Sequence, residues 1–385
     1  MNISINRTFN YYNTAIPQYS TYAIKNDSLE RTPSSDCFIK TDPNISNPIF
    51  TGAKKKKETK KYEDILKNID GLHDPYSDVI MISQKKYKHL QNKIHKRANI
   101  ESMNNLMEGY KQHMFPSELE VFYLLKYETT KAKKQGKAGN LTYTDILQTY
   151  LPLAKARLVN AQFDVTDSIR DYAKHNLNKK EQKEVENYLK IIDKDIYADR
   201  FRIKYSIDLL RRLYDDIPDK RKVDKIIRLS HNFPNTATSS DAFIVKYADK
   251  SQNEIAELLV LPSKISIEHI KPQSARGEDK GDNYLAASLR MNNYRSSTPL
   301  DEVIERYPQI PKQTQRYIDD LIAKINRGGL TEIAYTLPGV KESLFAESKG
   351  LIDINLSKLN PNISNQIDTF QSKINNLVDK YNSKE

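Results

Sequence analysis

The sequence predicts a mainly α-helical fold that carries one small unit of two strands and a helix. Two observations lead to this prediction. Apolar residues recur at helical spacing over much of the chain, most regularly between residues 116 and 234. Strand-like alternation, a loop, a second short strand and a helix follow one another most clearly over residues 264–296. A chain of 385 residues is long for one domain, so we expect more than one structural unit.

The chain begins with a segment for which we predict no packed structure. Residues 1–61 are rich in Asn, Ser, Thr and Tyr and show no sustained periodicity, so we expect them to be disordered or loosely attached. The segment ends in the basic cluster Lys54–Lys61. This cluster could hold nucleic acid through phosphates, or it could be the solvated start of the next helix, and both interpretations stay open.

Residues 62–234 are predicted to form a helical domain. A short helix is expected over 62–69 and a longer one over 85–100. Between them, Asp74-Pro75-Tyr76-Ser77 reads as a turn before an apolar strand. Ser117 and Thr142 stand at good helix starts. The helices predicted in this region cover 117–137, a segment from 142, 166–176, 179–193, 195–215 and 218–230.

Residues 235–308 are predicted to form the small strand-and-helix module, and 309–385 a C-terminal helical region. Ala242–Tyr247 is expected to be a strand or a buried short segment. In Thr298-Pro-Leu-Asp301, the threonine is expected to cap a new helix with Pro299 in its first position. The remaining elements are helix 251–259, strand 264–270, loop 272–282, strand 284–287, helix 289–296 and helices 312–326, 330–349 (broken at Pro338-Gly339) and 363–381.

The module contains a characteristic string of polar residues. In order, the string is Glu268-His269-Ile270, Pro272-Gln-Ser274, Gly277, Gly281, Asn283, Asn292 and Arg295. The string, with strand, loop, strand and helix in that order, resembles the HNH endonucleases and their ββα-metal module. The resemblance covers roughly a tenth of the chain and implies a helical scaffold carrying a small ββα-metal (HNH) module.

The resemblance also implies roles for individual residues. A neutral imidazole is a natural base near pH 7, so His269 is expected to activate the attacking water. Glu268 and Asn292 are expected to hold a metal, and a carboxylate, a carbonyl and waters suit Mg²⁺ or Mn²⁺ better than Zn²⁺. Asn283 is expected to assist catalysis by bonding backbone groups across the loop, which would keep His269 in line. Asn283 and Asn292 also fit turn and cap positions, and Asn293 competes with Asn292 as the ligand.

Three basic residues are predicted to contact the substrate phosphate. Arg295 lies one turn after Asn292 and carries a planar guanidinium that can clamp a phosphate oxygen. Arg276 and Lys280 lie in the connecting loop. Arg295 could equally be an ordinary solvated arginine.

The sequence departs from the HNH pattern in two places. Glu268 replaces the commoner Asp before the histidine, and Met291 stands where a cysteine is often found, so no zinc knuckle can form there. Further upstream, Asp74-Pro75-Tyr76-Ser77 looks like the family's Cys-Pro-x-Cys knuckle with both cysteines lost. If that likeness is real, a long helical insertion splits the module.

Composition limits the possible partners and environment. A formal net charge of +11 favours a polyanionic partner. The single cysteine, Cys37, excludes an internal disulfide and a Cys-rich zinc site. No apolar start resembles a signal peptide, and no run reaches the roughly eighteen apolar residues of a membrane helix. We therefore expect a soluble, cytoplasmic protein.

Together these features predict a metal-dependent HNH-type endonuclease that hydrolyses double-stranded DNA. The alternative is a catalytically inactive nucleic-acid-binding protein that keeps the HNH shape. A third interpretation is a helical interaction protein in which the string of residues is accidental. The sequence does not determine target specificity, the choice between DNA and RNA, or the oligomeric state.

Overall fold

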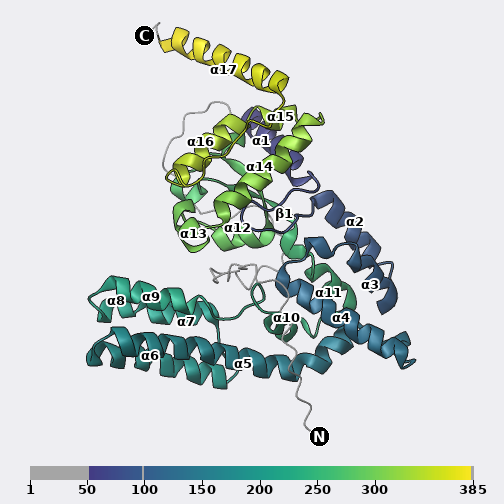
Figure 1. Ribbon diagram of the computed structural model, residues 1–385, viewed down its shortest axis with the longest axis vertical. Helices are drawn as coiled ribbons and strands as arrows, with labels where there is room; N and C mark the ends of the chain where they lie inside the picture. The colour runs from purple at the N-terminus through teal and green to yellow at the C-terminus, as the bar shows by residue number, and fades with distance from the viewer. Residues whose placement is uncertain (1–51, 98, 383–385) are drawn as a thin grey trace.

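The computed structural model describes residues 52–97 and 99–382 (Figure 1). The predicted mainly α-helical fold is confirmed, and the described residues contain one sheet of two antiparallel strands. Reciprocal capping boxes start several helices, including those that begin after Thr142, Asn178 and Ser251. Within this part of the chain, no helix is both long and apolar enough to cross a membrane.

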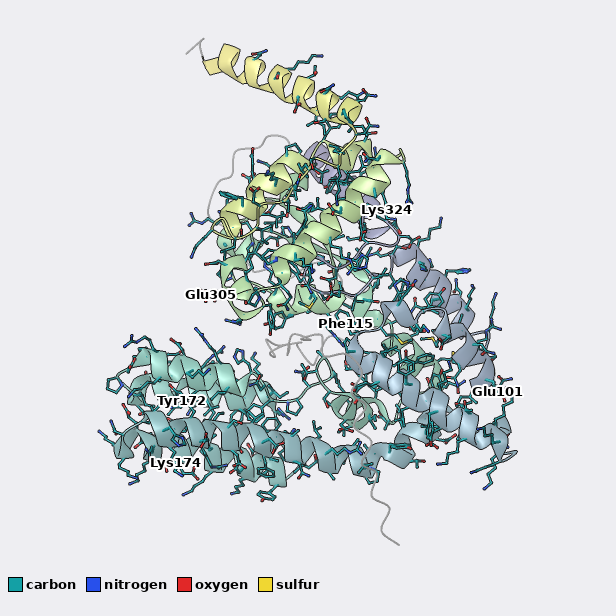
Figure 2. All side chains as sticks on the ribbon, viewed as in Figure 1. Glu101, Phe115, Tyr172, Lys174, Glu305 and Lys324 are labelled. Carbon is teal, nitrogen blue, oxygen red and sulfur yellow. The ribbon has the colours of Figure 1, made fainter. Side chains whose placement is uncertain are left out.

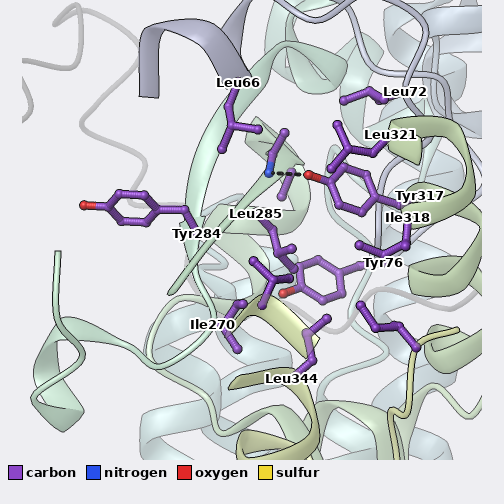
Figure 3. Packing of buried hydrophobic residues seen from close by; sticks show 14 of the residues in the cluster. Leu66, Leu72, Tyr76, Ile270, Tyr284, Leu285, Tyr317, Ile318, Leu321 and Leu344 are labelled. Carbon is purple, nitrogen blue, oxygen red and sulfur yellow. Dashed lines mark hydrogen bonds between the residues drawn. The ribbon is translucent and has the colours of Figure 1, made fainter. Parts of the chain in front are cut away.

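The hairpin lobe contains the two strands and the helices packed around them. Its buried core includes side chains from residues 66–81 and from most elements after residue 264 (Figure 3). Its elements are α1 (Gly52–Lys67), β1 (Ile265–His269), β2 (Tyr284–Ser288), α12 (Leu289–Arg295), α13 (Leu300–Arg306), α14 (Ile310–Asn326), α15 (Thr331–Ala334), α16 (Leu337–Glu347) and α17 (Pro361–Asn382).

The helical base has a second apolar core that joins two distant parts of the chain. Its elements are α2 (Gln84–Ile94), α3 (Ile100–Glu108), α4 (Pro116–Lys134), the first half of α5 (Tyr143–Asn176), α10 (Ser240–Tyr247) and α11 (Gln252–Leu258). Figure 2 shows Phe115 where the base meets the hairpin lobe. Phe115 packs in the core of the lobe although it directly precedes α4 of the base.

The helical arm has a third core of its own. It consists of the second half of α5, α6 (Lys179–Tyr197), α7 (Ile203–Arg211), α8 (Leu213–Asp216) and α9 (Lys220–Ser230). In Figure 1 the arm extends to the lower left, away from the base. The helix α5 belongs to both cores and so connects the arm to the base.

The three cores divide the chain differently from the predicted domains. The predicted domain 62–234 is shared among all three cores, and the predicted units 235–308 and 309–385 share the core of the hairpin lobe. The chain leaves the lobe after residue 82 and returns at 264, where Ile82 and Lys264 form a parallel bridge. Ile82 both donates and accepts a backbone hydrogen bond here: Ile82 N donates to Ser263 O, and Ile265 N donates to Ile82 O, each at 3.0 Å.

Several local predictions were wrong. For Ala242–Tyr247, the buried short segment is present and the alternative, a strand, was wrong: the segment is helical, and Ser239 caps α10 by accepting from Ala242 N. The separate helix predicted at 166–176 is the end of α5, which continues past Pro152. The helix predicted over 85–100 ends earlier, since α2 stops at Ile94 and α3 begins only at Ile100. Helix α13 begins one residue later than predicted, with Pro299 before its first residue.

Much of the predicted N-terminal segment lies outside the described residues. Residues 1–51, including Cys37, are in that part. Residues 52–61 form the start of α1, so they are not disordered, and the interpretation of Lys54–Lys61 as the start of the next helix is confirmed. In the basic cluster, Lys61 Nζ pairs with Glu332 Oε1 at 2.6 Å, and both side chains are exposed.

Candidate active site

The predicted strand–loop–strand–helix unit is present. In the hairpin, Glu268 pairs with Leu285 and His269 pairs with Tyr284. Helix α12 packs on both strands, and the side chain of Ser288 caps it by accepting from Met291 N at 3.2 Å. Successive residues of a strand face opposite sides, so Glu268 and His269 point in different directions. Figure 3 shows the same division on β2, where Tyr284 extends away from Leu285.

His269 is the last residue of β1, and its ring is held from the loop side. Nε2 lies 3.0 Å from Asp279 Oδ1 and 3.4 Å from Gln273 Nε2. The ring meets that of Tyr284 edge-on, with centroids 4.8 Å apart. The side chain is 22% exposed, so part of it is open to solvent. Nδ1 has no hydrogen-bond partner among the described residues.

Asp279 is the polar residue at this site that sequence reasoning missed. Its Oδ1 also accepts from Gln273 Nε2 at 2.8 Å and from Tyr284 Oη at 3.3 Å. The hydrogen bond with His269 is the largest influence that lowers the pKa of Asp279, so the carboxylate is ionised. Its position in a loop with mixed charges offered no periodic signal.

Asn283 bonds backbone groups across the connecting loop. Oδ1 accepts from Lys271 N at 2.8 Å, and Nδ2 donates to Lys271 O at 3.1 Å and to Glu278 O at 2.9 Å. The loop passes so close to itself that a Cβ on Gly277 would lie 1.8 Å from Lys271 O, which explains the glycine. Asn283 thereby fixes the two ends of the loop that carries Asp279.

Glu268 does not occupy the predicted metal-ligand position. Its side chain is buried in the core of the lobe and forms an ion pair with Arg295 Nη1. Burial raises the pKa of Glu268 to about 7, and Arg295 opposes that rise. The predicted convergence of Glu268, His269 and Asn292 on one cavity is therefore wrong for Glu268, because its carboxylate is buried and already paired with Arg295.

Arg295 is likewise not available for the predicted phosphate contact. Only 1% of its side chain is exposed. Besides Glu268, its guanidinium donates to His269 O at 2.7 Å and to Ile270 O at 2.5 Å. These bonds hold the end of β1 against α12, so the role of Arg295 is structural. The sequence spacing predicted its place on the helix correctly but not its burial.

Asn292 lies on the face of α12 that meets β1. Its Nδ2 donates to Ser266 Oγ at 2.5 Å and to Ile267 O at 2.8 Å, while Oδ1 accepts no hydrogen bond from the described residues. Asn293, the competing candidate, is exposed. Asn292 is therefore the asparagine that contacts the hairpin.

The two loop cations stay on the surface. Arg276 is exposed, has a left-handed backbone with φ of 64°, and its side chain has no ion pair within the described part of the chain. Lys280 is exposed and pairs with Glu278. Both can reach a ligand in solvent, and Arg276 can do so without breaking an existing pair.

The segment around Asp74 packs directly on the hairpin unit. Asp74 is buried and accepts from Ser288 N at 2.9 Å and from Tyr76 N at 2.7 Å. Burial raises its pKa to about 6, and the hydrogen bonds from Ser288 oppose the rise. Residues 83–262 therefore interrupt a single packed unit, the arrangement predicted if the Asp74–Ser77 likeness to a lost knuckle were real.

The described residues do not offer a metal cluster of the usual kind. No group of three or more His, Cys, Asp or Glu side chains among them could hold an ion. With Glu268 turned inward, the predicted pair of ligands, Glu268 and Asn292, does not fit a metal.

Comparisons with protein-family models, curated proteins and solved structures find no match for this chain. The geometry of the hairpin lobe is therefore the basis for any functional conclusion.

Proposed function

We propose that the chain is an HNH-type endonuclease that hydrolyses phosphodiester bonds in DNA, with His269 as the general base. The observation that carries the proposal is the position of His269. It ends the first strand of a hairpin packed on a helix, its ring is held by a carboxylate, and part of the ring is open to solvent. A histidine used only for packing would need neither a carboxylate that orients its ring nor partial exposure of the side chain to solvent.

The proposed chemistry follows from the residues on that side of the hairpin. Imidazole can accept a proton from water near pH 7, and a positioned base of this kind contributes about 10² to 10⁴-fold to a rate. Asn283 keeps the loop from shifting beneath the ring. Arg276, exposed and without an ion pair among the described residues, is available to contact a phosphate oxygen, with Lys280 nearby in sequence.

We also propose that cleavage depends on a divalent cation, Mg²⁺ or Mn²⁺, and this dependence is to be measured. The described residues contain no group of three or more His, Cys, Asp or Glu side chains that could hold the ion. Mg²⁺ commonly keeps several waters and uses substrate phosphates as ligands, so a requirement for it would not need a protein cage. No step above depends on the ion.

The second candidate is a nucleic-acid-binding protein without nuclease activity. The ion pair of Glu268 with Arg295 favours it, because two residues expected to serve catalysis serve packing. The net charge of +11 supports a nucleic-acid partner under either candidate.

Plasmid nicking tests the proposal. Purified wild-type protein, His269→Ala and His89→Ala are incubated with supercoiled plasmid in Mg²⁺, in Mn²⁺ and with chelator, and binding to a duplex is measured in parallel. His89 is an exposed histidine on α2, so its variant controls for loss of any imidazole. We expect His269→Ala to lose about 10² to 10⁴-fold in nicking rate with unchanged binding, and His89→Ala to match wild type.

Equal nicking by wild type and His269→Ala would refute the assignment of His269. Tight binding by all three proteins with no cleavage in either metal would replace the proposal with the second candidate.

A further inference from the structure

The loop between the two strands contains an exposed carboxylate with more partners than a surface residue needs. Asp279 has 62% of its side chain exposed, yet Oδ1 receives donors from three places: His269 at the end of β1, Gln273 at the start of the loop and Tyr284 at the start of β2. Such a convergence fixes the carboxylate relative to both strands.

We propose that Asp279 is the positioning residue of His269: it accepts the Nε2–H of the ring and leaves the Nδ1 lone pair to take the proton from water. The inference rests on the proposed function, in which His269 is the base. It adds the identity of the tautomer, the nitrogen that reacts and the residue that determines both.

The geometry supports this direction of the hydrogen bond. An ionised carboxylate has no proton to give, so at 3.0 Å the ring nitrogen must be the donor. The hydrogen bond from His269 is also the main reason that the pKa of Asp279 is lowered, which keeps the carboxylate ionised. A neutral imidazole that donates from Nε2 has its acceptor at Nδ1. Nδ1 is the nitrogen without a hydrogen-bond partner among the described residues.

The backbone beside Asp279 is fixed as well. Asn283 Nδ2 donates to the carbonyl of Glu278 at 2.9 Å, one residue before Asp279. The carboxylate therefore stands on a fastened part of the loop, as a positioning group requires.

Nitrogen-15 NMR of the histidine rings tests the inference without relying on activity. The ring tautomer of His269 is read in wild type, Asp279→Ala, Asp279→Glu and Glu278→Ala, with the signal assigned by its loss in His269→Ala. We expect neutral His269 to carry its proton on Nε2 in wild type and in Glu278→Ala, and to show mixed tautomers in Asp279→Ala. Circular dichroism checks the fold, which we expect to persist because Asp279 is exposed.

Plasmid nicking supplies the second readout. Asp279→Ala should nick about 10 to 10²-fold more slowly than wild type with duplex binding no weaker, and Asp279→Glu should recover part of the rate. Glu278→Ala should nick like wild type. A proton on Nδ1 in wild type, or the same tautomer in wild type and Asp279→Ala, would overturn the inference. A wild type that does not nick would refute the proposed function, and the tautomer measurement would still decide whether Asp279 orients the ring.

Discussion

Replacing Glu268 with Gln should remove a pH dependence from the stability of the hairpin lobe. The wild-type carboxyl is buried beside Arg295, and its pKa is raised from an ordinary 4.5 to about 7. The folded state therefore binds a proton that the unfolded state has already lost over this interval. The stabilisation is fully present below pH 4.5 and is lost as the pH rises through about 7. Gln keeps an acceptor for Arg295 but does not titrate.

The size of the effect follows from the shift. A rise of roughly 2.5 pKa units corresponds to about 3 kcal/mol, of which about 2 to 3 kcal/mol falls between pH 5 and pH 8. Over that range the free energy of local opening should fall this much more in wild type than in Glu268→Gln. The comparison concerns the slope with pH and not the absolute stability, since Gln leaves the buried guanidinium without a counter-charge.

Hydrogen exchange measured by mass spectrometry on peptides covering β1 and α12 gives the opening free energy, after correction for the intrinsic pH dependence of exchange. Glu342→Gln, an exposed change on α16 of the same lobe, is the control. Asp74, whose pKa is raised to about 6, contributes a dependence of the same sign to both proteins, and its charge is one of the causes that raise the pKa of Glu268. Parallel pH profiles for wild type and Glu268→Gln would refute the buried, titrating carboxyl.

Two further predictions concern residues that hold the lobe together. Asn283→Ala should remove the bonds to Lys271 and Glu278, lower local stability by about 1 to 3 kcal/mol and speed hydrogen exchange in the loop. Asn293→Ala should change neither the stability nor the exchange. Unchanged exchange in Asn283→Ala would contradict the role of Asn283 in fixing the loop. Glu118→Ala should destabilise the protein by about 3 to 5 kcal/mol in urea unfolding, because Arg290 would stay buried without its partner. A loss no larger than that of the exposed Glu120→Ala would contradict it.

The order of elements in the candidate site could be predicted from the sequence, because it depends on local patterns. Alternation predicted β1, a second short strand was expected where β2 lies, and Asn283 was expected to bond across the loop where it does so. Glu268 and Arg295 were assigned to function because sequence spacing shows which residues are neighbours and not which side of a strand is covered. The burial of Glu268 depends on Tyr76, Leu285 and the rest of a core assembled from distant segments.

The grouping of helices into three cores could not be predicted for a similar reason. The boundary at residue 82 is created by a pairing with Lys264, 182 positions further on. Neither segment contains a local pattern that predicts this pairing. Asp279 was missed because an exposed loop carboxylate has no period, and its importance comes from three donors brought together by the hairpin.

The cations of the hairpin unit have two different roles, one in packing and one at the surface. On α12, Arg290 pairs with Glu118 of the base and lies over the ring of Phe115 at 4.3 Å, while Arg295 holds the end of β1. Both are buried, so these charges fasten the helix between the base and the sheet and cannot meet a phosphate. The exposed cations Arg276 and Lys280 lie instead in the loop that joins the two strands. Under the proposed function, a phosphate is therefore expected to meet the cations of the loop and not those of α12.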